Sequence, residues 1–127
     1  MRLLQANGRI SKRALGSGDL IFAESRDGSG LPVELILLDE RLTFLSLGQV
    51  FWSDLSSDEE DQAFAERLVR CVVFGGARTL KSGRACYLVC GDNAHFAPAN
   101  ARELHRWPAW TSTAHEYDAT SVRIGCL

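Results

Sequence analysis

Apolar residues recur at helical spacing over residues 57–74, and this is the clearest pattern in the chain. Ser57 followed three residues later by Glu60 matches the capping box that opens many helices. The glycine pair Gly75-Gly76 offers the left-handed stop that is typical of a helix end. The pattern therefore predicts one amphipathic helix that covers a core with an apolar stripe, which comprises Phe64, Ala65, Leu68, Val69, Cys71 and Val72.

The residues before this helix form short apolar runs separated by polar or glycine-rich breaks. Four runs predict strands, at residues 19–24, 33–38, 42–47 and 50–52. Residues 35–38 are apolar on both faces, which predicts a central strand with one side beneath the helix. Because the breaks are short, the strands should pair as an antiparallel meander.

The two ends of the chain give weaker patterns. Asn7-Gly8 predicts a hairpin that joins residues 2–6 to residues 9–13, since both turn residues tolerate positive φ. After the helix we expect a polar connection at 76–84, a strand at 85–90 and a short helix at 98–106. Two closing strands at 111–117 and 120–126 should then pair through a turn at Asp118.

Together these elements predict an α+β fold, with an antiparallel, curved sheet, one main amphipathic helix packed on one face and a short second helix. A doubly wound parallel sheet would need helices between most strands, and residues 1–52 predict none. The chain shows no repeat, low-complexity tract or linker. We therefore expect residues 1–127 to form a single globular domain.

Composition narrows the class of protein. The chain is 46% hydrophobic and 24% charged, as in an ordered domain, and no run approaches the roughly 20 apolar residues of a membrane span. The first residues show no secretory signal, so we expect a cytoplasmic protein without a membrane partner. The net charge of −2 gives no general reason to bind nucleic acid. Twelve of the 14 basic residues are arginine, a usage that suggests a bacterial or phage genome.

Most of the four cysteines, which are Cys71, Cys86, Cys90 and Cys126, are interpreted as small core residues. Without a secretory signal we do not expect a disulfide framework. Cys86 and Cys90 lie on one face of a strand, too far apart to share a metal ion, and no paired Cys or His spacing is present. We expect neither a metal nor a cofactor.

Titratable residues form two weak catalytic candidates. Cys90, Asp92 and His95 follow a strand, where a nucleophilic site or a simple turn would fit. His115 and Glu116 lie near each other in sequence, but a strand would direct them to opposite faces, as at a solvent-facing hairpin end.

Residues 75–82 contain Gly, Lys and Ser but lack the order of a phosphate-binding loop. Arg78, Lys81 and Arg84 could still form a modest anion-binding rim, and an exposed polar loop is the alternative.

The segments Leu3–Asn7 and Gly18–Ala23 resemble the opening of small ADP-ribosyltransferase-like domains, over about a fifth of the chain. The resemblance implies an enzyme acting on a nucleotide or NAD-like ligand, with Gln5 on a first strand at the ligand-contacting position. The chain departs from the family pattern at three points. Gln5 stands where one subgroup of the family has His. Thr111-Ser112-Thr113 comes too late in the chain for the Ser-Thr-Ser strand of the other subgroup, and no Glu-x-Glu motif follows it.

Two surface segments are candidate partner contacts. The first is the acidic helix start, with Asp58, Glu59 and Asp61, for which a solvated helix end is the alternative. The second is the segment of residues 106–110, because exposed tryptophan beside arginine is typical of interface anchors. Its candidate contact residues are Arg106, Trp107 and Trp110. The alternative is that this segment closes the core. Trp52 is interpreted as a hydrophobic lid.

No coherent catalytic set emerges, so the first hypothesis is a non-enzymatic protein-binding or inhibitor module. It would act by surface occlusion, as a bacterial immunity protein or a phage-encoded antagonist does. The alternative is the small enzyme described above. A homodimer that pairs the edges of its sheet is a third hypothesis.

Overall fold

The computed structural model describes residues 2–91 and 98–126. In this part of the chain the elements are, in order, α1 (Arg2–Asn7), β1 (Gly8–Leu15), β2 (Gly18–Ser25), β3 (Val33–Leu38), β4 (Arg41–Leu47), β5 (Phe51–Asp54), α2 (Glu59–Gly75), β6 (Ala77–Ser82), β7 (Ala85–Cys90), β8 (Arg102–Trp107) and β9 (Thr120–Ile124).

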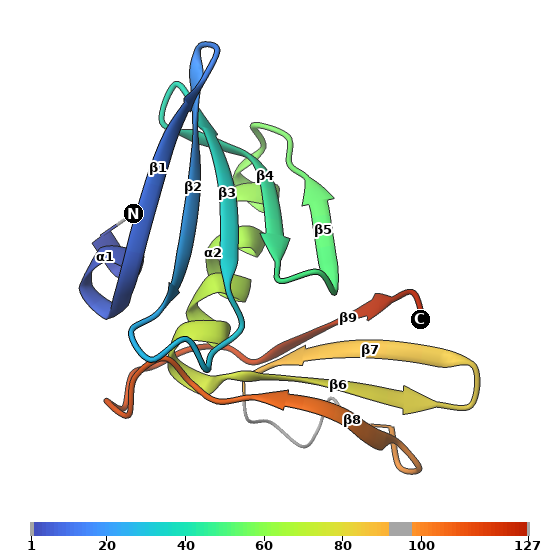
Figure 1. The fold of residues 1–127 in the computed structure, drawn as a ribbon. Helices are drawn as coiled ribbons and strands as arrows, with labels where there is room; N and C mark the ends of the chain where they lie inside the picture. The colour runs from blue at the N-terminus through green and yellow to red at the C-terminus, as the bar shows by residue number, and fades with distance from the viewer. Residues whose placement is uncertain (1, 92–97, 127) are drawn as a thin grey trace.

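The first five strands form an antiparallel meander, which we name sheet A, in the order β1-β2-β3-β4-β5. This confirms the predicted meander and the central position of β3. Asp39 and Glu40 adopt positive φ angles of 49° and 63° in the tight turn between β3 and β4. Figure 1 shows α2 lying across one face of sheet A.

The last four strands form a second antiparallel sheet, sheet B, in the order β8-β6-β7-β9. The sequence predicted one sheet. The expected polar connection at 76–84 is instead β6 and the turn to β7, and the expected helix at 98–106 is wrong because these residues end in β8. Residues 111–117 form no strand, and β9 pairs with β7 rather than with a neighbouring hairpin partner.

The start of the chain also differs from the prediction. Residues 2–7 form α1, so the hairpin at Asn7-Gly8 is wrong, and β1 turns into β2 at Gly16 instead. The helix is favoured because it buries Leu4 completely in the core. The side chain of Asn7 donates a 2.7 Å hydrogen bond to the carbonyl oxygen of Leu3 at the end of this helix.

The main helix lies where the sequence predicts it, but its first turn is stabilised differently. The expected capping box is wrong, because Asp58 is the N-cap and makes no side-chain cap hydrogen bond. The carboxylate of Asp61 instead accepts a 2.8 Å hydrogen bond from the backbone N–H of Ser56. At the other end, Gly76 donates its N–H to the carbonyl of Val72, so the helix stops at the predicted glycine pair. The φ of 73° and ψ of −169° at Gly76 favour glycine but are not the left-handed helical conformation that was expected.

One hydrophobic core joins α2 to both sheets, so the fold class is confirmed as α+β with two antiparallel sheets, a main helix and a short helix. The predicted stripe faces this core, and Ala65, Leu68 and Val72 are almost inaccessible to solvent. None of the helices in the described ranges has the length and apolar character needed to cross a bilayer.

Candidate functional site: a groove between the two sheets

The helix α2 leaves part of sheet B uncovered. In the pairing of β6 with β7, Ala77 stands opposite Cys90 and Lys81 stands opposite Cys86. Because alternate residues of a strand share a face, these four residues lie on the same face of sheet B. Ala77 and Cys90, next to the end of α2, belong to the core. Lys81 and Cys86 lie at the opposite end of this face.

A groove of about 560 Å³ occupies this uncovered end. We name it the inter-sheet groove. Its walls include Val50 of the turn between β4 and β5, Trp52 of β5, and Lys81, Arg102, Leu104 and Trp107 of sheet B. In Figure 1 the connection between β4 and β5 lies toward β9, so an end of sheet A approaches the uncovered face of sheet B here.

The groove exposes large apolar side chains. Trp52 is 69% exposed and Leu104 is 48% exposed, while Trp107 and Ile124 are half-buried. The ring of Trp52 stacks on Phe44, with 6.4 Å between the ring centroids. The expectation that Trp52 is a lid over the core is therefore wrong.

The charged side chains that line the groove are basic. Lys81 and Arg102 stand directly opposite each other on β6 and β8, and among the described residues neither has an ion pair. No acidic side chain of the described ranges is among the residues that line the groove. The groove therefore combines apolar surface with uncompensated positive charge.

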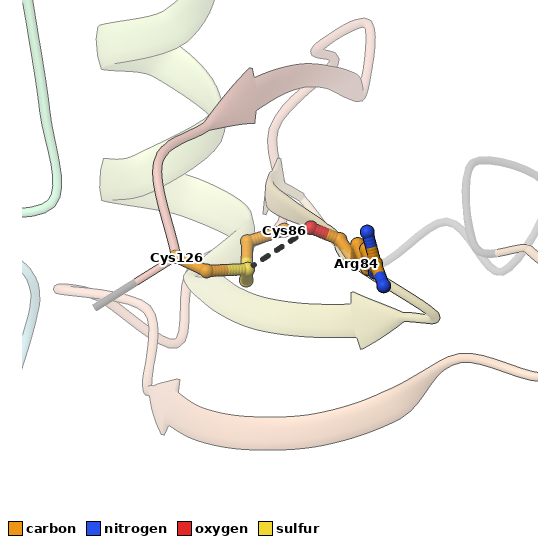
Figure 2. Close-up of a disulfide and its surroundings, with 3 residues drawn as sticks. All are labelled: Arg84, Cys86 and Cys126. Atoms are coloured by element: carbon orange, nitrogen blue, oxygen red, sulfur yellow. Dashed lines mark hydrogen bonds between the residues drawn. A yellow bond between two sulfur atoms is a disulfide. The ribbon is translucent and has the colours of Figure 1, made fainter.

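A disulfide between Cys86 and Cys126 forms part of the groove wall (Figure 2). It corrects the expectation that the cysteines form no disulfide, because the pairing of β9 with β7 brings the Cα atoms of Cys86 and Cys126 to 5.4 Å. Cys126 Sγ also lies 3.5 Å from the carbonyl oxygen of Arg84. Only the reduced thiol could donate a hydrogen bond there, since a disulfide sulfur carries no proton.

Cys71 and Cys90 are unpaired and buried, as predicted for core residues. The thiol of Cys71 donates a hydrogen bond to the carbonyl of Asp118 at 2.7 Å, and burial raises its pKa to about 11. Burial also raises the pKa of Cys90 well above its ordinary value. Because the thiolate is the nucleophile, Cys90 is poorly suited to the catalytic role considered from the sequence.

The structure divides the arginine and tryptophan segment between two roles. Trp107 lines the groove and meets His105 edge to face at 4.3 Å. Trp110 packs against the loop before β3 and donates its indole N–H to the carbonyl of Leu31 at 3.0 Å. Arg106 is exposed and forms a salt bridge with Glu103 at 2.8 Å.

The acidic helix start lies at the beginning of α2, and Asp58, Glu59 and Asp61 are not among the residues that line the inter-sheet groove. Asp58 and Glu59 are exposed and are available to a partner. Asp61 is half-buried, and its hydrogen bonds with Ser56, the backbone N–H above all, lower its pKa. Its carboxylate is thus already used to hold the helix start.

Of the catalytic candidates, the structure brings His115 and Glu116 together. They line a hollow of about 880 Å³ with Glu66, Arg67, Arg70, Tyr117 and Asp118, and His115 stacks on Phe74 at 4.1 Å. Gln5 lies exposed on α1, where the resemblance implied a strand. Asp92 and His95 lie outside the described residues.

Sequence reasoning did not find the groove as a unit. Lys81 was noted as part of an anion-binding rim, but its partner Arg102 was expected in a helix. If β8 is recognised as a strand, the basic residues Lys81 and Arg102 on neighbouring strands are the sequence feature that indicates the groove. Within the described ranges no group of three or more His, Cys, Asp or Glu side chains is arranged to hold a metal ion.

The fold and the groove define a small α+β protein with two antiparallel sheets and an apolar, basic groove between them. Comparison with protein-family models, curated proteins and solved structures finds no match for this chain.

Proposed function

We propose that this chain is a non-enzymatic protein-binding module and that the inter-sheet groove is its main contact surface. One observation carries the proposal: Trp52 is 69% exposed at the edge of a groove that also exposes Leu104. Large exposed aromatic side chains beside a pocket are the usual anchors of protein interfaces.

The energetics favour such a role for Trp52. Covering the exposed part of a tryptophan removes roughly 150 Å² of apolar surface from water, which is worth about 4 kcal/mol. Folding alone does not recover this free energy, because Trp52 remains 69% exposed in the folded chain. A partner that covers Trp52 would recover it.

The test is capture of partners from the native host by the wild-type chain and by two variants. Trp52→Ala should lose a stoichiometric protein partner and should weaken its affinity at least tenfold when the partner is purified. Leu15→Ala is the matched control, because Leu15 is 45% exposed at the far hairpin between β1 and β2. Equal capture by Trp52→Ala and the wild type would refute the proposal.

The finer form of the proposal is an inhibitor of the immunity-protein or phage-antagonist type that occludes a functional surface of its target. The exposed carboxylates of Asp58 and Glu59 would then add a second contact to a basic target surface. Replacing both with Lys should lower the association rate while the fold is retained. Asp61 is left unchanged in this variant because its carboxylate holds the helix start.

We also propose that the protein works in the cytoplasm. The Cys86–Cys126 disulfide is the observation that weighs against this location, because disulfides persist mainly in oxidising compartments. Alkylation of thiols at the moment of cell lysis, followed by mass spectrometry, tests it. Four alkylated cysteines support the cytoplasm, whereas an oxidised Cys86–Cys126 pair refutes it.

The enzymatic alternative rests on the hollow that holds His115 and Glu116. In this alternative the chain would act on a nucleotide or NAD-like ligand bound in the hollow, as in the ADP-ribosyltransferase-like domains that the opening of the chain resembles, but without Gln5, which lies on α1. Incubation of the chain with NAD and its captured partner should then add a covalent mass to the partner. His115→Ala should abolish that mass increase and leave capture unchanged.

A further inference from the structure

We propose that the inter-sheet groove binds an extended acidic peptide segment, with one of its carboxylates between Lys81 and Arg102 and a neighbouring apolar side chain against Trp52 and Leu104. This inference rests on the proposed function and names the chemistry of the partner.

The register of sheet B carries the electrostatic part of the argument. Lys81 of β6 and Arg102 of β8 are direct cross-strand partners. Like charges in this position repel each other and destabilise a sheet. In natural sheets a basic residue usually stands opposite an acidic or neutral one. Lys81 and Arg102 depart from this preference, and among the described residues no carboxylate forms an ion pair with either of them.

Two basic residues of sheet A have an acidic partner on the neighbouring strand. Arg9 pairs with Glu24 at 3.1 Å and Lys12 with Asp19 at 3.4 Å, each across neighbouring strands. Among residues 2–91 and 98–126, Lys81 and Arg102 have no such partner, and Lys81 is half-buried, which increases the cost of leaving its charge unpaired. An incoming carboxylate would supply the missing partner and accept hydrogen bonds from both side chains.

The apolar part of the groove distinguishes a peptide from a nucleic acid. Val50, Leu104 and Ile124 line it together with two tryptophans, whereas a nucleic-acid channel relies on a track of many basic residues along the phosphate backbone. The chain as a whole carries a net charge of −2. An apolar segment that bears carboxylates matches both features.

The experiment selects peptides from a random twelve-residue display library on the immobilised protein. The wild type should enrich peptides that combine Asp or Glu with Phe, Leu or Trp. The double variant Lys81→Glu, Arg102→Glu should lose these peptides and enrich basic ones. Failure to enrich any peptide, or enrichment of neutral or basic peptides by the wild type, would overturn the proposal.

The best acidic peptide is then measured by fluorescence anisotropy. Arg102→Gln should weaken it at least tenfold, whereas Arg123→Gln should leave the affinity unchanged. Arg123 is a matched control because it lies on β9 opposite Tyr87, on the other face of sheet B. A labelled oligothymidylate that binds more tightly than the peptide, or a groove-dependent dimer of the chain itself, would identify another occupant and overturn the proposal.

Thermal unfolding separates the binding role from a structural one. Because Arg102→Gln removes a like-charge repulsion, its melting temperature should equal or exceed that of the wild type while its peptide affinity falls. A lower melting temperature would mean that the pair supports the fold, and would overturn the assignment. If Trp52→Ala loses the native partner but Arg102→Gln retains it, the proposed function stands and this inference fails.

Discussion

Two carboxylates, Asp27 and Asp61, fix backbone turns on which the elements depend. Asp27 accepts hydrogen bonds from the backbone N–H and the hydroxyl of Ser29, at 3.0 and 2.7 Å, and from the hydroxyl of Ser25 at 3.1 Å. Asp61 accepts the backbone N–H of Ser56 before α2. These donors favour the ionised carboxylates, so the pKa of each lies below the ordinary value of 3.8.

The lowered pKa values predict an acid-sensitive fold. Because the folded pKa lies below the unfolded one, the stabilising effect is complete above the unfolded value and is lost as the pH falls through the lowered values. The double variant Asp27→Asn, Asp61→Asn should therefore lose less stability between pH 5 and pH 3 than the wild type. Urea unfolding at a series of pH values measures this, and parallel curves would contradict it.

Trp110 and Trp52 are the same residue type in opposite environments. Trp110 donates its indole N–H to Leu31, and a Cβ built on Gly30 would lie 2.7 Å from this indole nitrogen. Gly30 is thus required where the ring crosses the backbone. Trp52 has no such hydrogen bond among the described contacts.

Replacement of Trp110 by Phe should destabilise the fold by about 1–3 kcal/mol, because the carbonyl of Leu31 loses its donor. The matched variant Trp52→Phe should change the free energy of unfolding by less than about 0.5 kcal/mol, as is usual for exposed sites. Chemical denaturation of both variants provides the comparison. Equal losses would mean that Trp52 also supports the fold.

At the scale of elements, strong local patterns were predictable. The apolar stripe of α2 has clear helical spacing, and β2 to β5 stand out as short apolar runs between polar or glycine-rich breaks. The short strands β6 and β8 are different. All but the last residue of β8 are exposed, and the pattern therefore lacks the apolar alternation by which a strand is recognised.

The candidate site was less predictable than the fold. Trp107 was identified, but Trp52, Lys81 and Arg102 come from segments that only the second sheet brings together. The Cys86–Cys126 pairing likewise depends on β9 lying beside β7, a non-local contact that spacing along the chain does not reveal.

The disulfide predicts a measurable difference between oxidised and reduced protein. It closes a loop with a sequence separation of 40, which corresponds to about 4 kcal/mol of chain-entropy stabilisation. The variant Cys126→Ser should lose a comparable amount and should become insensitive to reductant. If wild-type unfolding is the same with and without reductant, the disulfide does not stabilise the fold.

At the scale of the whole molecule, the helix determines where binding can occur. It joins the two sheets through one core but ends at Gly75, so the far end of sheet B stays uncovered. The exposed Trp52 of sheet A and the uncompensated basic pair of sheet B meet at this uncovered end. The position of the groove thus follows from where α2 ends. Its apolar and basic side chains favour a ligand that carries apolar groups and carboxylates.

The most direct test is an NMR footprint of the purified native partner on the isotope-labelled chain. The account predicts that binding shifts the indole N–H signal of Trp52 and the amide signals of residues 79–81 and 102–105, while residues 115–118 remain unchanged. Shifts confined to residues 115–118 or to the helix start at residues 58–61, with the groove signals unmoved, would contradict it.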